Sequence, residues 1–252
     1  MNIQDAIKYF LDYTEPYNDI SDMCVLKVDH TMRVMNLCER IAKSIGLNEE
    51  DVELAKLCGL LHDIGRFEQW KNFETFDDSK SIDHASLGTS ILEENNWLQD
   101  FLHDEEKEAI VKNSVFYHNK FKIYQGLPDR YKMFCNIVRD ADKIDILYLY
   151  TIKHIHPNTK DKAFSENIYE ALMQGREIKK NEKKTKADTL AVSLGFIFDI
   201  NFKESIEILK SEDYLNQEID MYLEKTQNEE FKHQLIKVKE KINNYMEERL
   251  TC

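Results

Sequence analysis

Histidines and aspartates at inward-facing positions are the residues of this chain best suited to chemistry. His30 lies four residues before Val34 and seven before Leu37, so it shares the apolar face of a predicted helix. His118 follows Val111 by seven residues, which again is an inward helical spacing. A histidine on such a face needs a partner inside the fold, and a metal ion is one such partner.

Further residues of the same kind occupy two other predicted helices. Asp142 lies four residues after Val138 and four before Ile146, on an apolar face. His62 and Asp63 are adjacent at the end of an almost wholly apolar segment. Unpaired buried charges are costly, whereas neutral imidazole and carboxylate are good ligands for first-row divalent metals. The pattern therefore predicts that these side chains share a cation.

Each residue alone also has a simpler interpretation. A lone inward histidine such as His30 is more often a hydrogen-bonded core residue, and an isolated Asp142 can cap a helix or pair with a cation. The adjacent pair of His62 and Asp63 is common by chance. Only the order and context of the whole set favour a metal site. The remaining histidines lack this pattern and are predicted to be surface or structural: His103, His154, His156 and His233.

Apolar periodicity predicts the helices that must position these residues. They are expected at about residues 25–45, 49–63, 84–95, 104–118 and 130–155. Asn48 is expected to cap the second of them, because Asp51 follows three residues later. Gly46 and Gly65 are expected to end the first and second helices. A polar loop is expected over 68–83, and Pro157 is expected to end the helix over 130–155.

The rest of the chain also reads as helical. Thr185 and Asp188 form a pair similar to a capping box, which opens an apolar stretch over 190–200. Amphipathic helices are expected over 202–225 and 229–249. The chain holds only seven glycines and three prolines, which argues against a turn-rich fold. We predict an all-α fold: one helical domain over 1–184 and a C-terminal helical extension over 185–252, packed on the same core.

Composition restricts the partners. The formal net charge of −13 and the absence of a long basic run argue against binding to nucleic acid polymers. No apolar run approaches the ~20 residues of a membrane span, and the N-terminus lacks a secretion signal. Five cysteines without a CxxC pair suit a reducing compartment. We expect a cytoplasmic protein without a membrane partner; its oligomeric state is left open.

Five segments resemble the HD superfamily of metal-dependent phosphohydrolases over residues 28–147. They are DHTMRVMNLCERIA, LLHDIGRFEQW, SIDHASLG, FYHNK and IVRDADKIDIL. The stretch FIFDINFKES is similar to that of uncharacterised bacterial HD-domain proteins. The fold this implies is a single HD-domain helical bundle followed by the extension. The first metal site that the resemblance implies is His30, His62, Asp63 and Asp142. His84 and His118 match the members that bind two metals, in which the aspartate corresponding to Asp63 bridges the ions.

Two other aspartates lie close to Asp142 in the sequence. Asp140 and Asp145 flank Asp142, but the family pattern selects Asp142 and the apolar periodicity agrees; Asp145 is the alternative.

Many members carry a lysine that touches substrate phosphate where this chain has Arg66. Arginine offers a planar fork for two phosphate oxygens.

Both cationic candidates have structural alternatives. If Arg66 is structural and does not bind phosphate, it is expected to pair with Glu68 or Asp77 in the predicted loop. Lys143 is the second candidate for the substrate phosphate; its alternative is an ion pair with Asp63 or a place on the surface.

The implied activity is hydrolysis of a phosphate ester in a nucleotide or small phosphorylated metabolite. Asp63, Arg66 and Lys143 are the predicted catalytic residues. The cofactor would be one or two divalent transition-metal ions, with Fe, Mn, Ni, Co and Zn not distinguished. A di-iron oxygenase of the same superfamily offers the same four histidines and two aspartates. A sensor that binds a nucleotide without catalysis is the third hypothesis, although such members usually lose ligands.

Overall fold

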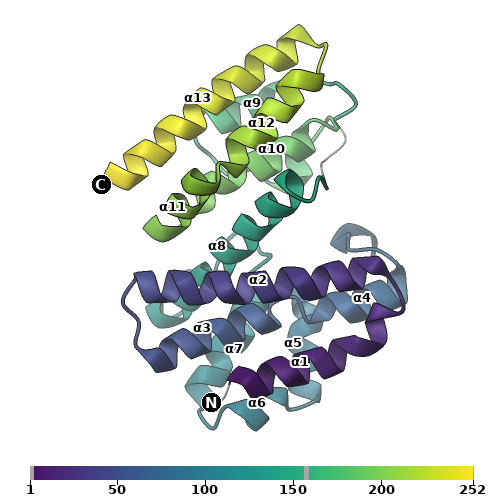
Figure 1. Ribbon diagram of the computed structural model, residues 1–252, viewed down its shortest axis with the longest axis vertical. Helices are drawn as coiled ribbons and strands as arrows, with labels where there is room; N and C mark the ends of the chain where they lie inside the picture. Colours follow the sequence, from purple (N-terminus) through teal and green to yellow (C-terminus); the bar gives the residue numbers. More distant parts are fainter. Residues whose placement is uncertain (1–2, 156–158, 252) are drawn as a thin grey trace. The chain divides into compact units, whose positions relative to one another are not determined.

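The computed structural model describes residues 3–155 and 159–251, and every regular element in these ranges is a helix (Figure 1). The all-α prediction is therefore confirmed. Two compact units divide between Asp142 and Lys143, inside one helix. The predicted domain boundary between residues 184 and 185 falls within the second unit and stays a prediction. None of the described helices combines the length and apolar character needed to cross a membrane.

The first unit carries the predicted site. Its elements are α1 (Ile3–Asn18), α2 (Asp22–Ser44), α3 (Glu49–Leu61), α4 (Gly65–Phe73), the 3-10 turn η1 (Asp78–Lys80), α5 (His84–Glu94), α6 (Trp97–Phe101), α7 (Glu105–Tyr117) and the first part of α8 (Asp129–Thr151). α2 and α3 lie side by side, and α1 packs against both (Figure 1). The core between these helices includes the fully buried Val34, Ile41, Leu57 and Phe67.

The α2–α3 hairpin follows its sequence signals closely. Asn48 caps α3, because its side chain accepts a hydrogen bond from the backbone N–H of Asp51 at 2.9 Å. Gly46 has φ of +76°, the left-handed conformation that suits the turn after α2. At Gly59 an added Cβ would lie 2.8 Å from Cys38 Sγ. Glycine there lets α3 approach α2 closely, three residues before His62.

The region over 68–83 differs from the prediction of a polar loop. α4 continues to Phe73, and the short turn η1 follows it. The prediction that Gly65 ends the preceding helix is wrong. α3 ends at Leu61, and Gly65 begins α4. A Cβ at Gly65 would lie 2.2 Å from the carbonyl oxygen of His84, so glycine is required for α4 to touch α5. Close packing, and not helix termination, explains this glycine.

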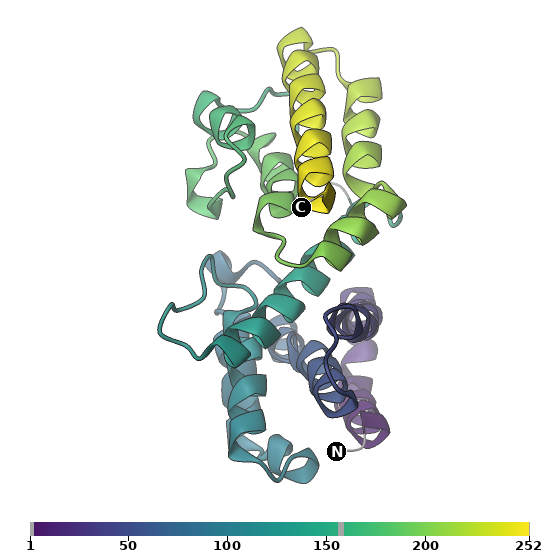
Figure 2. The same cartoon turned by 90° about the vertical axis from the view of Figure 1, so that its left-hand side faces the viewer.

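The second unit contains the remaining helices. They are the end of α8, α9 (Glu166–Met173), η2 (Lys180–Glu182), α10 (Asp188–Leu194), η3 (Gly195–Asp199), α11 (Lys203–Glu212), α12 (Tyr214–Lys225) and α13 (Glu229–Thr251). α12 and α13 lie side by side (Figure 2). The single helix predicted over 202–225 is wrong, because Asp213 adopts φ of +55° and separates α11 from α12. Pro157 lies outside the described residues.

The predicted pair of Thr185 and Asp188 is present. The N–H of Asp188 donates to Thr185 Oγ1 at 3.3 Å, and the N–H of Thr185 donates to Asp188 Oδ2 at 2.8 Å. The fully buried Asp188 also accepts from the N–H of Ser165 at 2.9 Å, just before α9. One carboxylate thus joins the starts of α9 and α10.

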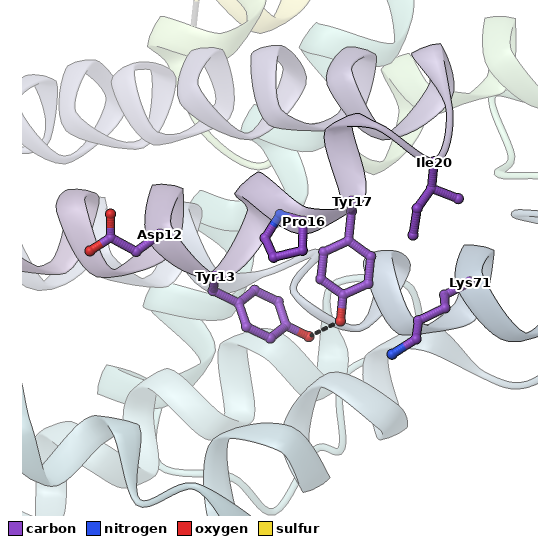
Figure 3. A pocket seen from close by; sticks show the side chains of 6 residues that line it. All are labelled: Asp12, Tyr13, Pro16, Tyr17, Ile20 and Lys71. Atoms are coloured by element: carbon purple, nitrogen blue, oxygen red, sulfur yellow. Dashed lines mark hydrogen bonds between the residues drawn. The ribbon is translucent and has the colours of Figure 1, made fainter.

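A surface pocket beside α1 shows how this helix is fixed on the unit. It is lined by Asp12, Tyr13, Pro16, Tyr17, Ile20 and Lys71 (Figure 3). The Tyr17 hydroxyl donates to the carboxylate of Glu68 on α4. The Tyr17 ring also packs against Phe67, with centroids 5.6 Å apart. These contacts attach α1 to α4, the helix that begins two residues after Asp63.

Glu218 on α12 is an exception to the rule that buried polar groups are paired. Its side chain is fully buried, and neither carboxylate oxygen has a hydrogen-bond partner among the described residues. Burial raises the pKa of Glu218 to about 8, from an ordinary value of 4.5. The folded second unit therefore keeps a proton that the unfolded chain releases near pH 4.5.

This buried carboxyl should make stability depend on pH. Between about pH 5 and 8 the folded state binds more protons at Glu218 than the unfolded state, so the free energy of unfolding falls as pH rises. At ~1.4 kcal/mol per pH unit, the loss due to Glu218 is about 4 kcal/mol across this window. Glu218→Gln should remove this contribution to the slope. Denaturant unfolding at several pH values measures it, and equal slopes for parent and variant would contradict the assignment.

Candidate metal centre

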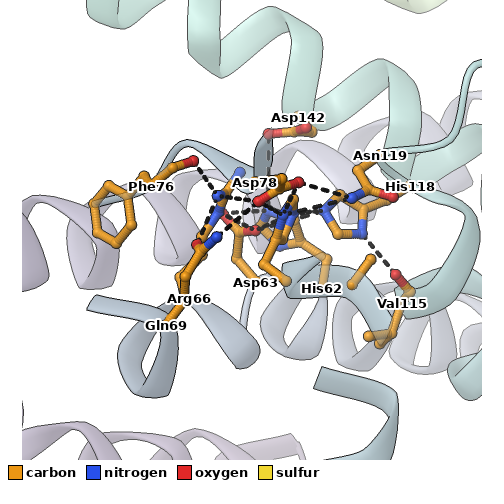
Figure 4. A network of polar contacts seen from close by, with 12 residues as sticks. His62, Asp63, Arg66, Gln69, Phe76, Asp78, Val115, His118, Asn119 and Asp142 are labelled. Atoms are coloured by element: carbon orange, nitrogen blue, oxygen red, sulfur yellow. Dashed lines mark hydrogen bonds and ion pairs between the residues drawn. The ribbon is translucent and has the colours of Figure 1, made fainter. Parts of the chain in front are cut away.

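The first unit brings together all six residues that the family resemblance implies as ligands. His62, Asp63, His118 and Asp142 are labelled in Figure 4. The six residues come from the middle of α2, the turn after α3, the start of α5, the end of α7 and α8: His30, His62, Asp63, His84, His118 and Asp142. The four histidines and Asp63 are buried, whereas the Asp142 side chain is 17% exposed. Helix ends and inward faces thus converge on one place, as their spacing predicts.

Asp63 divides the histidines into two sets. Its Oδ2 lies 3.5 Å from His30 Nε2 and 3.6 Å from His62 Nε2. Its Oδ1 lies 3.3 Å from His84 Nε2 and 3.5 Å from His118 Nε2. Within each set the candidate ligand atoms lie within 4.8 Å of one another. This carboxylate can therefore serve two ions, one with each oxygen.

Backbone carbonyls fix the tautomers of two of these histidines. His62 Nδ1 lies 2.7 Å from the carbonyl oxygen of Gly59, and His118 Nδ1 lies 2.7 Å from that of Val115. A carbonyl only accepts, so each Nδ1 carries the hydrogen and donates it. In the neutral rings Nε2 then holds a bare lone pair directed into the centre. Metal-binding histidines are commonly oriented in this way.

The donor atoms fit a cation. His84 Nε2 and His118 Nε2 lie 2.9 Å apart, and His84 Nδ1 faces the Asp78 carboxylate at 2.7 Å, so both Nε2 atoms are lone-pair donors in the neutral rings. Burial lowers the pKa of His118 to about 4, so His118 itself is neutral near neutral pH. Asp63 Oδ1 is buried without a hydrogen-bond partner among the described residues. Imidazole and carboxylate together suit a divalent transition-metal ion.

Asp142 belongs to the first set. Its Oδ1 lies 3.2 Å from His30 Nε2 and 3.8 Å from His62 Nε2. Burial opposes its charge, but the imidazoles of His30 and His62 outweigh burial and hold the pKa of Asp142 well below its ordinary value. The alternative ligand, Asp145, is buried in the second unit.

Comparison with protein families agrees with this geometry. The family described as "HD domain" matches residues 28–148. This segment is an HD domain. The comparisons with curated proteins and with solved structures gave no match. Residues 28–148 therefore form an HD domain with a buried His/Asp cluster typical of a metal-dependent phosphohydrolase site, and further helices follow it.

Lys27 is a residue of the HD-domain site that sequence reasoning missed. Its Nζ lies 2.5 Å from Asp63 Oδ2 and 5.8 Å from the centre of the Phe76 ring. Burial disfavours a charge on Asp63, but Lys27, His62 and Arg66 outweigh burial and hold the pKa of Asp63 well below its ordinary value. Lys27 precedes a predicted ligand by one helical turn, a spacing that could have identified it.

Arg66 lies beside the HD-domain cluster, as its position after the His-Asp pair predicts. Its Nη1 donates to the carbonyl oxygen of Phe76 at 2.7 Å, to Gln69 Oε1 at 2.9 Å and to Asp78 Oδ1 at 3.1 Å. Its Nε lies 3.4 Å from Asp63 Oδ1. The Nη2 atom has no hydrogen-bond partner among the described residues. The Nη1 atom of the guanidinium is therefore anchored, and Nη2 can donate hydrogen bonds to a ligand.

The partner of Arg66 in the loop is not one of the two expected carboxylates. Glu68 accepts from Tyr17, and Asp77 accepts from the N–H of Ser79 at 3.1 Å. Glu68 and Asp77 both lie in the region that the sequence predicts to be an irregular loop. Once α4 forms, Glu68 faces α1, and Asp77 caps η1.

Lys143 is buried in the second unit. Its Nζ lies 2.6 Å from Asp199 Oδ2, and only 7% of the residue is exposed. The alternative of a surface lysine is therefore wrong. Its predicted contact with substrate stays a prediction.

Proposed function

We propose that this HD domain hydrolyses phosphate esters of small molecules with the help of divalent transition-metal ions. The observation that carries the proposal is the shared carboxylate of Asp63, whose two oxygens face separate pairs of histidine Nε2 atoms. When bound, such ions lower the pKa of water towards neutrality and offset charge on phosphoryl oxygens. The chain's own residues hold and orient the ions and contact the ester.

Cationic side chains beside the centre support a phosphorylated substrate. Lys27 and Arg66 are each 15% exposed at their side chains, so they can meet a ligand that enters from solvent. Arginine suits two phosphate oxygens because its donors form a planar fork. The net charge of −13 favours a small phosphorylated molecule over a polyanion, since favourable charge is confined to the site.

A substrate screen tests this proposal. The Mn²⁺-loaded protein is incubated with phosphomonoesters, phosphodiesters and nucleoside triphosphates, and released phosphate or nucleoside is measured. His62→Ala should abolish turnover of the best substrate. His103→Ala is the matched control, because His103 is exposed and lies outside the cluster. No turnover of any ester by a folded, metal-loaded protein would contradict the proposal.

The two rival hypotheses predict different properties of the protein. An oxygenase would be coloured and iron-containing, and would consume oxygen with an organic substrate. A sensor would bind a nucleotide without releasing a product. The complete set of ligands argues against a degenerate sensor.

Arg66→Ala should weaken turnover of that substrate while leaving the metal content unchanged. Loss of a charge-assisted hydrogen bond to phosphate corresponds to about 2–3 kcal/mol, or a factor of roughly 30 to 150 in kcat/KM. Arg66→Lys should recover part of the loss, because lysine supplies the charge without the fork. Steady-state kinetics with elemental analysis of each variant measures both effects.

Lys71→Ala provides the control for this series. It removes an exposed cation from the same helix, and Lys71 contacts Glu68 and not the metal cluster. If Arg66→Ala retains the parent rate and affinity, the phosphate role of Arg66 is wrong and its anchoring of the loop is sufficient.

A further inference from the structure

We propose that Asp78 is a positioning residue that holds one histidine ligand and the phosphate-binding arginine with a single carboxylate (Figure 4). Asp78 begins η1, in a segment without helical periodicity, and the sequence does not mark it. The arginine half of this inference rests on the proposed function. The histidine half depends only on metal binding.

The contact with His84 distinguishes this ligand from two others. Asp78 Oδ2 lies 2.7 Å and Oδ1 2.8 Å from His84 Nδ1. His62 and His118 instead direct Nδ1 at backbone carbonyls. A carboxylate behind an imidazole fixes the ring and raises the basicity of the other nitrogen. His84 should therefore depend on a side chain, and not only on its helix, for its strength as a ligand.

The same carboxylate anchors Arg66. Its Nη1 lies 3.1 Å from Asp78 Oδ1, and its Nε lies 3.4 Å from Asp63 Oδ1. His84 likewise lies between the two carboxylates, with Asp78 Oδ2 2.7 Å from Nδ1 and Asp63 Oδ1 3.3 Å from Nε2. The arginine and the histidine thus occupy parallel positions between two carboxylates. A shift of Asp78 would move both.

Asp78 is itself held by neighbours from two other segments. Gln69 Nε2 donates to its Oδ1 at 2.8 Å, and Asn119 Nδ2 lies 3.3 Å from its Oδ2. Gln69 is fully buried on α4 and also accepts from Arg66. This network gives the Asp78 carboxylate a defined orientation, which is the requirement for a residue that positions others.

The test compares Asp78→Asn and Asp78→Glu with Asp77→Asn. Asp77 is the adjacent residue in the same turn, but among the described residues its carboxylate contacts only Ser79 and Lys80. Two quantities are measured: the number of Mn²⁺ ions bound per chain as free Mn²⁺ is raised, and the calorimetric affinity for inorganic phosphate at saturating Mn²⁺. Neither readout requires a known substrate.

In Asp78→Asn the second Mn²⁺ should bind about 10- to 100-fold more weakly, the usual effect of losing such a supporting carboxylate, while the first ion is retained. Phosphate should bind about tenfold more weakly, because Arg66 loses an ionic anchor. Asp78→Glu should recover part of the Mn²⁺ affinity, and Asp77→Asn should match the parent in both measurements.

Three results would overturn the inference: a parent that binds one ion only, an Asp78→Asn variant with parental Mn²⁺ affinity, or equal losses in Asp77→Asn. Failure of the proposed function is distinguishable from these. A parent that binds two ions but hydrolyses no ester contradicts the function and leaves the role of Asp78 towards His84 supported by the Mn²⁺ data. A parent that hydrolyses an ester while Asp78→Asn binds Mn²⁺ normally contradicts only the inference.

Discussion

Asp63→Ala is expected to reduce the bound metal from two ions to almost none and phosphate-ester hydrolysis to background. Asp63 is the carboxylate that faces both pairs of histidines, with Oδ2 towards the first pair and Oδ1 towards the second. Its loss removes negative charge from both sets at once. No other described aspartate contacts both pairs of Nε2 atoms; Asp142 faces only the first.

Elemental analysis of the purified variant measures this effect, and activity on the best substrate accompanies it. Asp100→Ala is the matched control, because Asp100 is exposed and lies outside the cluster. That variant should keep the parental metal content. Full occupancy in Asp63→Ala would contradict a shared carboxylate, and retention of one ion would show that the two sites do not depend on it equally.

Removal of the metal should lower the melting temperature by on the order of 10 °C. A ligand that binds only the folded state stabilises it by about 4 kcal/mol at a thousandfold excess over its Kd. For a chain of this size, each kcal/mol corresponds to roughly 2–4 °C. An ion between His84 Nε2 and His118 Nε2, which lie 2.9 Å apart, would also satisfy two buried imidazole nitrogens at once.

Differential scanning calorimetry with and without chelator measures the shift, and elemental analysis verifies that the metal has left. Asp63→Ala serves as the control, since a variant without metal should not respond to chelator. The parent should recover its melting temperature when Mn²⁺ is restored. An unchanged transition in verified metal-free parent would mean that the site does not contribute to stability.

Helical periodicity predicts which faces of the helices carry the candidate metal ligands. His30 shares its face with Val34, and both are fully buried on α2. Asn48 caps α3 as expected, which fixes the start of the helix that ends beside His62. These features are local, because each depends on residues within a few helical turns. The resemblance supplied the grouping of the ligands, which periodicity alone did not.

Long-range contacts account for what the sequence did not predict. Asp78 reaches His84 and Arg66 from a turn without a repeating pattern, so no spacing rule identifies it. The sequence around Gly65 predicts a helix end, because the contact with α5 that requires glycine comes from residues far along the chain. The sequence does not predict the start of α4 for the same reason, because the contacts made there are with α5, which is distant in the sequence.

A titration of metal-free protein with Mn²⁺, with phosphate release followed at each step, tests the central claim most directly. The substrate is the best ester from the screen, and bound Mn²⁺ per chain is measured in the same samples. We expect the rate to rise from background and to reach its plateau at two bound ions per chain. Full activity without metal, or two bound ions with no release of phosphate from any ester, would contradict a metal-dependent phosphohydrolase.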